Sequence, residues 1–135
     1  MNDYRKEDLA AALQVLSTTI INCERIQPKF AESSSQHSLL KNRIKALYIS
    51  RTLIVNGSLT NKYTKEDLTK ALPPISSIIS KCEKAQLKFL EGTSHHTRFE
   101  NIIKAMYISK SFITDEIKKE IEYRFKESLN RTKNS

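Results

Sequence analysis

The chain has 135 residues, of which 39% are hydrophobic and 28% charged, and it holds only two glycines and three prolines. This length suits one domain with a buried core, and the scarcity of turn-forming residues argues against an all-β sandwich or barrel. Lysine and arginine outnumber aspartate and glutamate by 23 to 15, a formal net charge of +8, which favours anionic partners such as nucleic acid, nucleotides or acidic protein surfaces.

The first residues of the chain are mainly polar and charged, without the apolar stretch of a signal peptide. No segment approaches the ~18 consecutive apolar residues that span a bilayer. These two features predict a cytoplasmic protein without a membrane partner. The two cysteines, Cys23 and Cys82, are too few for a disulfide framework and lack a metal-binding spacing.

The most specific feature of the sequence is an internal repeat. Residues 4–54 align with residues 63–113 without a gap, and about half of the aligned positions are identical. A match of this extent predicts two structural units of the same fold. The repeated Lys-Glu-Asp-Leu and Asn-x-Ile-Lys-Ala stretches resemble those of small bacterial or phage helical proteins, which implies helices and no particular function.

Each repeat begins with an apolar series that is typical of an amphipathic helix. The apolar positions follow one another at intervals of three and four residues, which places them on one side of a helix. This spacing predicts a heptad-like seam and near-parallel packing against another helix. The seam residues are Leu9, Leu13, Leu16, Ile20, Cys23, Gln27 and Phe30 in the first repeat, and Leu68, Leu72, Ile75, Ile79, Cys82, Gln86 and Phe89 in the second.

A capping box marks the start of this helix in the second repeat. We expect the Thr64 side chain to accept a hydrogen bond from the backbone N–H of Asp67, and the Asp67 side chain to accept one from the backbone of Thr64. Tyr63 would then pack on Leu68 as a hydrophobic staple. The first repeat has Arg5 at the capping position, so its box is incomplete.

Two prolines, Pro73 and Pro74, fall within the same helix of the second repeat. A proline in a helix interior costs ~3 kcal/mol or more, because it removes a backbone hydrogen bond and clashes with the preceding turn. We therefore expect a kink or a restart near Pro73, with residues 64–72 forming a short leading helix.

The second helix of each repeat follows a polar connection and has two apolar faces. Ser35 and Ser94 are expected to cap these helices, and Gly57 to end the first of them. A helix with two apolar faces must contact two neighbours, and one hairpin cannot supply both, so the hairpins should pack on each other. The two faces are Leu40, Ile44, Leu47 and Ile54 against Ala46, Ile49 and Leu53, and, in the second repeat, Phe99, Ile103, Met106 and Ile113 against Ala105, Ile108 and Phe112.

The apolar pattern continues beyond the second repeat, set among alternating charges. It predicts a C-terminal helix, either continuous with the preceding helix or broken near Thr114, and a frayed end over residues 130–135. The surplus apolar surface of this extension also makes a homodimer an option. Its apolar residues are Ile117, Ile121, Tyr123, Phe125 and Leu129.

Together these features predict a single all-α domain over residues 1–135. It comprises a first hairpin repeat over residues 4–62, a second over residues 63–113, and a C-terminal helix and frayed tail over residues 114–135. We expect the two hairpins to be related by a pseudo-twofold axis and to pack as a four-helix bundle with a C-terminal helical extension.

A row of polar and basic residues along the second helices is the candidate binding site. Residues 33–64 include five basic residues and no acid, and helix N-termini attract anions. Such a row suits a phosphate, and we expect it to be stronger in the first repeat, because Glu100 takes the place of Lys41 in the second. The alternative is that the serines cap the helices, the histidines close the turns and the lysines form a solvated face over packed tyrosine rings. The row comprises Ser35, His37, Lys41, Lys45 and Tyr48 in the first repeat, and Ser94, His96, Lys104 and Tyr107 in the second.

Other site chemistry is scarce in the sequence. There is no nucleophile triad, pair of catalytic carboxylates or glycine-rich phosphate loop, and the histidines have no partner at a metal-ligand spacing. Matching positions in pseudo-symmetric units would bring Cys23 and Cys82 together at the twofold axis, but both lie on apolar seams, so we interpret them as core residues. We expect no catalytic residues, no metal and no cofactor.

These observations favour a non-enzymatic binding protein, of adaptor, inhibitor or immunity type, that acts through protein–protein contacts. The alternative is an anion binder that sequesters nucleotides or weakly binds nucleic acid through its basic helix face. Because the sequence holds no motif that reads bases, nucleic-acid binding would be salt-sensitive and indifferent to sequence.

Overall fold

The structure is a computed structural model that describes residues 4–58 and 62–133. Residues 1–3, 59–61 and 134–135 lie outside the described part, so the predictions for the ends of the domain and for the end of the first hairpin repeat do not extend to them. Within that part every regular element is helical, which confirms the all-α prediction. The elements are α1 (Lys6–Ile26), the short 3-10 helix η1 (Gln27–Lys29), α2 (Ser35–Asn56), α3 (Lys65–Gln86) and α4 (Ser94–Lys133).

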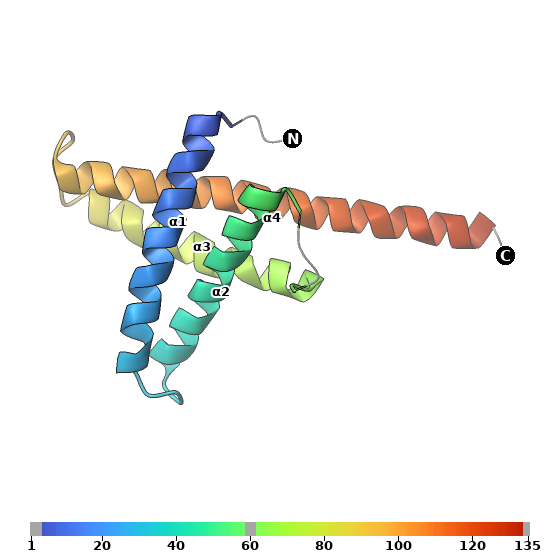
Figure 1. Ribbon diagram of the computed structural model, residues 1–135, viewed down its shortest axis with the longest axis horizontal. Coiled ribbons are helices and arrows are strands. Elements are labelled where there is room, and N and C mark those ends of the chain that lie inside the picture. The colour runs from blue at the N-terminus through green and yellow to red at the C-terminus, as the bar shows by residue number, and fades with distance from the viewer. Residues whose placement is uncertain (1–3, 59–61, 134–135) are drawn as a thin grey trace.

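The four α-helices form two pairs that are stacked crosswise. Helices α1 and α2 lie side by side, as do α3 and α4, and in Figure 1 the first pair runs across the second. Helix α2 contacts all three other α-helices, and α1 contacts both α2 and α4. The near-parallel packing expected from the seams therefore applies within each pair, whereas the two pairs cross.

The core lies where the two pairs meet. Both apolar faces of α2 supply fully buried side chains, Leu47 from one and Ile49 and Leu53 from the other, as its two-faced pattern predicts. Each such burial contributes on the order of 1.5–3 kcal/mol. The other large, fully buried apolar side chains are Leu16 and Ile20 from α1, Leu68 and Ile75 from α3, and Met106 and Ile113 from α4.

Two buried serines occupy matching positions in the second helices. Ser50 donates a hydrogen bond to the carbonyl of Ala46 at 2.8 Å, and Ser109 donates to the carbonyl of Ala105, also at 2.8 Å. Each hydroxyl is therefore satisfied within its own helix, so no polar atom of these side chains is left unpaired in the core.

The helix ends agree with the sequence in part. Thr64 and Asp67 form the expected capping box, with nitrogen–oxygen distances of 3.2 and 2.9 Å, and Arg5 precedes α1 without a side-chain cap. Gly57 ends α2 in the left-handed conformation, at φ +74°, where a residue without a Cβ has no steric penalty.

The caps predicted at Ser35 and Ser94 are wrong by one residue. The hydroxyl of Ser34 accepts the backbone N–H of His37 at 3.2 Å, and that of Thr93 accepts the backbone N–H of His96 at 3.3 Å. Ser35 and Ser94 are instead the first residues of their helices. At the start of both α2 and α4 two hydroxyl residues are adjacent in the sequence, so residue type alone did not distinguish the cap from its neighbour.

The restart predicted near Pro73 is also wrong, because α3 is one helix with Pro73 and Pro74 inside it. The two prolines leave the carbonyls of Thr69 and Lys70 without their usual donors. Both of these residues are exposed, so water can hydrate the carbonyls. Buried side chains on either side hold the helix against the core: Leu68 and Ala71 before the prolines, and Ile75, Ile78 and Ile79 after them.

The C-terminal extension is continuous with the last bundle helix. Helix α4 passes through Thr114 without a break and remains helical to Lys133, so the frayed end predicted from residue 130 is wrong for residues 130–133. Beyond Glu116 the helix has no buried residue within the described part, and Figure 1 shows it extending past the other three helices.

Candidate functional site

A long groove of about 1220 Å³ lies between α1 and α4. Its lining runs along the start of the chain from Tyr4 to Asn22 and along α4 from Ser94 to Ile108. Within the helices the lining runs from Asp8 to Asn22 and from Ser94 to Ile108, so at 1.5 Å per residue each stretch measures about 21 Å. Small-molecule pockets usually have volumes of about 300–1,000 Å³, so this groove is longer and larger than a compact ligand requires.

The α1 side of the groove consists mainly of small side chains. Ala11, Val15, Thr18 and Asn22 follow at intervals of four, three and four residues, which places them on one side of the helix. The Thr18 hydroxyl donates to a carbonyl of α1, so its hydrogen-bonding capacity is used locally. Where the two helices meet, the small buried residues Ala12 and Ala105 line the groove.

The α4 side of the groove carries most of its charge. Glu100 is engaged, because it accepts a hydrogen bond from the Gln86 side chain. Arg98 and Lys104 are exposed and form no ion pair within residues 4–58 and 62–133. These two cations are therefore available to a ligand in the groove.

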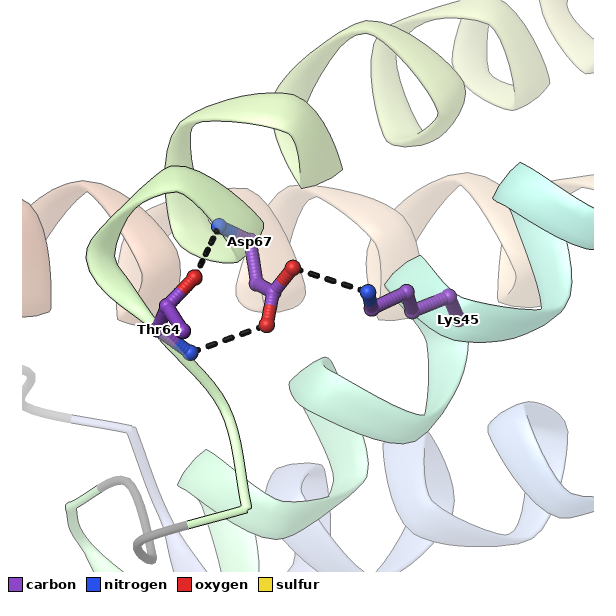
Figure 2. A network of polar contacts seen from close by, with 3 residues as sticks. All are labelled: Lys45, Thr64 and Asp67. Carbon is purple, nitrogen blue, oxygen red and sulfur yellow. Dashed lines mark hydrogen bonds and ion pairs between the residues drawn. The ribbon is translucent and has the colours of Figure 1, made fainter.

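Lys45, from the first predicted row, is held by an acid of α3. Its Nζ lies 2.8 Å from Oδ1 of Asp67, whose other oxygen accepts the Thr64 backbone N–H (Figure 2). Lys45, followed by the Thr64 amide, holds the pKa of the Asp67 carboxyl below its ordinary value, because both favour the ionised form. Lys45 thus joins α2 to the capped start of α3.

Tyr48, from the same row, is held by an acid of α1. Its hydroxyl donates to Oε2 of Glu24 at 3.0 Å, and the Arg51 guanidinium lies 4.8 Å from its ring centroid. The hydrogen bond to Glu24, together with the negative charge of that residue, raises the pKa of the Tyr48 phenol. Two residues of the first row therefore contact acids of the protein itself.

The remaining row residues differ between the repeats. His37 and His96 occupy equivalent positions: the backbone carbonyl of each accepts a hydrogen bond from a glutamine, Gln27 at 3.5 Å and Gln86 at 3.4 Å. Ser35 and Lys41 are exposed. In the second row, by contrast, three residues line the groove together: Ser94, Lys104 and Tyr107. No residue of the first row, which the sequence analysis expects to be the stronger site, lines this groove.

Both cysteine thiols feel the charge of a partly buried arginine, Arg43, that the sequence analysis did not single out. Burial raises the pKa of both the Cys23 and Cys82 thiols, and the positive charge of Arg43 partly offsets that rise in each. Both thiols are free. The Nε and Nη2 atoms of Arg43 are buried and make no hydrogen bond to the described residues. The repeat contains the relevant signal, because Arg43 aligns with the apolar Ile102.

The α1 side of the groove was also missed by sequence analysis. A stripe of alanine, valine and threonine outside the seam resembles ordinary helix surface, and only the crossing of α1 over α4 makes it one side of a groove.

Within the described residues, no group of three or more His, Cys, Asp or Glu side chains is placed to hold a metal ion. No described helix combines the length and apolar character needed to cross a membrane. Comparisons with protein-family models, curated proteins and solved structures give no match for this chain.

Proposed function

We propose that this is a non-enzymatic binding protein, of adaptor, inhibitor or immunity type, which holds a segment of a partner protein in the α1–α4 groove. The length of the groove carries the proposal, since about four helical turns of α4 border it. An amphipathic helix laid in such a groove places its apolar face on the floor and its polar face toward the rim. Val15, Ile103 and Ile108 supply apolar lining, and Gln14 and Asn101 supply polar groups.

Two adjacent alanines provide a matched test of this proposal. Ala10 and Ala11 are both exposed on α1, but only Ala11 lines the groove. Both tolerate arginine as helix residues, because alanine and arginine are both strong helix formers. A displayed library of amphipathic helical peptides, selected on the wild-type protein, should yield peptides that bind wild type and Ala10→Arg alike and bind Ala11→Arg at least tenfold more weakly. Peptides that bind all three proteins equally would place recognition elsewhere, and a library without enrichment would argue against the proposal.

The second candidate function is anion binding, and the second row supports it. Ser94, Lys104 and Tyr107 line the same groove as Arg98. A thermal-shift series against nucleotides detects a saturable pocket, since a bound ligand stabilises the folded state by mass action. A mobility-shift series at low salt detects backbone-phosphate binding, which weakens steeply as salt rises. If neither series detects binding, anion binding is contradicted and only the proposal of protein-partner binding remains.

Single lysine variants locate such an anion site. If the second row is the site, Lys104→Ala should abolish either activity, whereas Lys110→Ala, an exposed α4 position outside the groove lining, should not. Lys45→Ala distinguishes the rows, because that lysine is paired with Asp67. Loss of binding in Lys45→Ala with retention in Lys104→Ala would instead assign the site to the first row.

We also propose that the two hairpins are related by a pseudo-twofold axis, as the sequence repeat predicts. Matching contacts support the likeness of the two units on which such an axis depends: glutamines donate to the carbonyls of His37 and His96, and Ser50 and Ser109 donate within their own helices. In an experimental structure, residues 4–54 should superpose on residues 63–113 after a rotation near 180°. A rotation far from that value would contradict the proposal.

A further inference from the structure

The projecting part of α4 carries a continuous apolar stripe. Its members follow at intervals of four residues, so at about 100° per residue they span an arc of about 120°. Ile121 is 63% exposed, Phe125 65% and Leu129 47%. The α4 stripe consists of Ile117, Ile121, Phe125 and Leu129.

The stripe begins inside a small groove at the edge of the bundle. This groove, of about 350 Å³, lies between the first turns of α3 and the middle of α4. Leu68, Ile117 and Ile121 supply its apolar lining, and charged residues such as Lys65 and Glu120 surround them. The apolar surface is therefore continuous from the bundle onto the projecting helix.

Charge is distributed unevenly along this part of α4. Residues 115–122 contain four acids and two lysines, whereas residues 124–133 contain four basic residues and one acid. Two such helices laid parallel would place like charges side by side. Laid antiparallel, each acidic segment would face the basic segment of the other helix, which lowers the electrostatic energy of the pair.

We propose that a second copy of the chain covers the α4 stripe, forming an antiparallel homodimer through residues 117–129. The even spacing of the stripe makes it complementary to itself in the reverse direction. With the twofold axis near residue 123, Ile117 opposes Leu129 of the second copy, and Ile121 opposes its Phe125. Phe125 and Leu129 of the second copy then face the groove beside Leu68. This surface is separate from the α1–α4 groove, so the inference does not depend on the proposed function.

The first experiment measures mass in solution for matched aromatic variants. Phe125 lies on the stripe, whereas Tyr123, which is equally exposed at 64%, points to the opposite side of the helix by its spacing. Light scattering over a concentration series should give a dimer for wild type and for Tyr123→Ser, and a monomer, half that mass, for Phe125→Ser. A wild-type chain that stays monomeric at millimolar concentration would overturn the proposal, as would a Phe125→Ser variant that still dimerises.

The second experiment tests the orientation of the two copies. Position 118 of one chain lies opposite position 128 of the other in the antiparallel arrangement, and both positions fall within the arc of the stripe. An oxidised mixture of Lys118→Cys and Ser128→Cys proteins should form a disulfide-linked dimer that neither variant forms by itself. Wild type, oxidised in parallel, controls for Cys23 and Cys82. Cross-linking within each single variant would indicate parallel helices and overturn the antiparallel assignment.

Discussion

At the scale of single residues, the most unusual feature is the partly buried side chain of Arg43. Its aligned counterpart in the second repeat is Ile102, and two of its guanidinium nitrogens are buried without a hydrogen bond to the described residues. Burying a polar group without a partner costs about 1–3 kcal/mol. The first repeat therefore places an energetically costly cation where the second places an apolar side chain.

Replacing this arginine by the residue of the other repeat should not harm the fold. We expect Arg43→Ile to leave the free energy of unfolding unchanged or to raise it by about 1 kcal/mol, because the desolvation cost of the guanidinium disappears. Urea unfolding at neutral pH measures this change. The same variant should slow alkylation of Cys23, since the positive charge that lowers the thiol pKa is lost. A loss of stability of more than 1 kcal/mol would show that Arg43 makes favourable interactions.

The capping box of α3 gives a second prediction at this scale. Thr64→Ala removes the acceptor for the Asp67 backbone N–H and should lower the free energy of unfolding by about 1 kcal/mol. Arg5 offers the contrast: Arg5→Ala removes no side-chain cap, only an exposed ion pair with Asp8, and should change stability by much less. Equal effects of the two substitutions on chemical unfolding would contradict this account.

The Asp67 carboxylate makes part of this stability dependent on pH. Its folded-state pKa is lowered, first by Lys45 and then by Thr64, so its contribution is present above the unfolded-state pKa and is lost as pH falls through the folded-state value. Asp67→Asn should therefore melt below wild type at pH 7, and the two melting temperatures should converge below about pH 4. A difference that stays constant down to acid pH would show that ionisation of Asp67 is unimportant.

At the scale of elements, α3 shows that tertiary packing can maintain a helix through two prolines. Pro73 is exposed, and it occupies an interior position where the backbone hydrogen bond is missing. Proline also restricts the unfolded chain, which offsets part of that cost. We expect Pro73→Ala to raise the free energy of unfolding by about 1–2 kcal/mol in urea denaturation. A destabilised Pro73→Ala variant would indicate that the proline itself contributes to packing.

At the scale of the whole molecule, the bundle and the projecting end of α4 are separable. Buried residues of α4 end at Glu116 within the described part, so the segment beyond Tyr123 adds little to the core. A chain that ends at residue 123 should melt at the temperature of the dilute full-length protein. Only the full-length chain should melt at higher temperature as its concentration rises, because dimerisation stabilises the folded state by mass action. A large drop in melting temperature on truncation would show that the end of α4 supports the bundle.

The sequence by itself determined the helices, most of each seam, the capping box at Thr64 and the end of α2 at Gly57. The last seam residues, Phe30 and Phe89, are exceptions, because they lie beyond the ends of α1 and α3 and are exposed. These features depend on residues three or four positions apart, whose spacing sets both the side-chain face and the local hydrogen bonds. The sequence did not show that the caps are Ser34 and Thr93, since adjacent hydroxyl residues offer two acceptors one position apart.

Only the tertiary structure decided which of the two similar rows lies in a groove. Lys45 and Lys104 occupy equivalent positions in the repeat, yet one is paired with Asp67 and the other lines the wall opposite α1. Their surroundings come from residues distant in the chain, brought together by the crossing of the two hairpins. The continuity of α3 through its prolines has the same origin, because burial against α4 and α2 outweighs the backbone cost of the two prolines. The spacing of apolar residues in the sequence does not measure that burial.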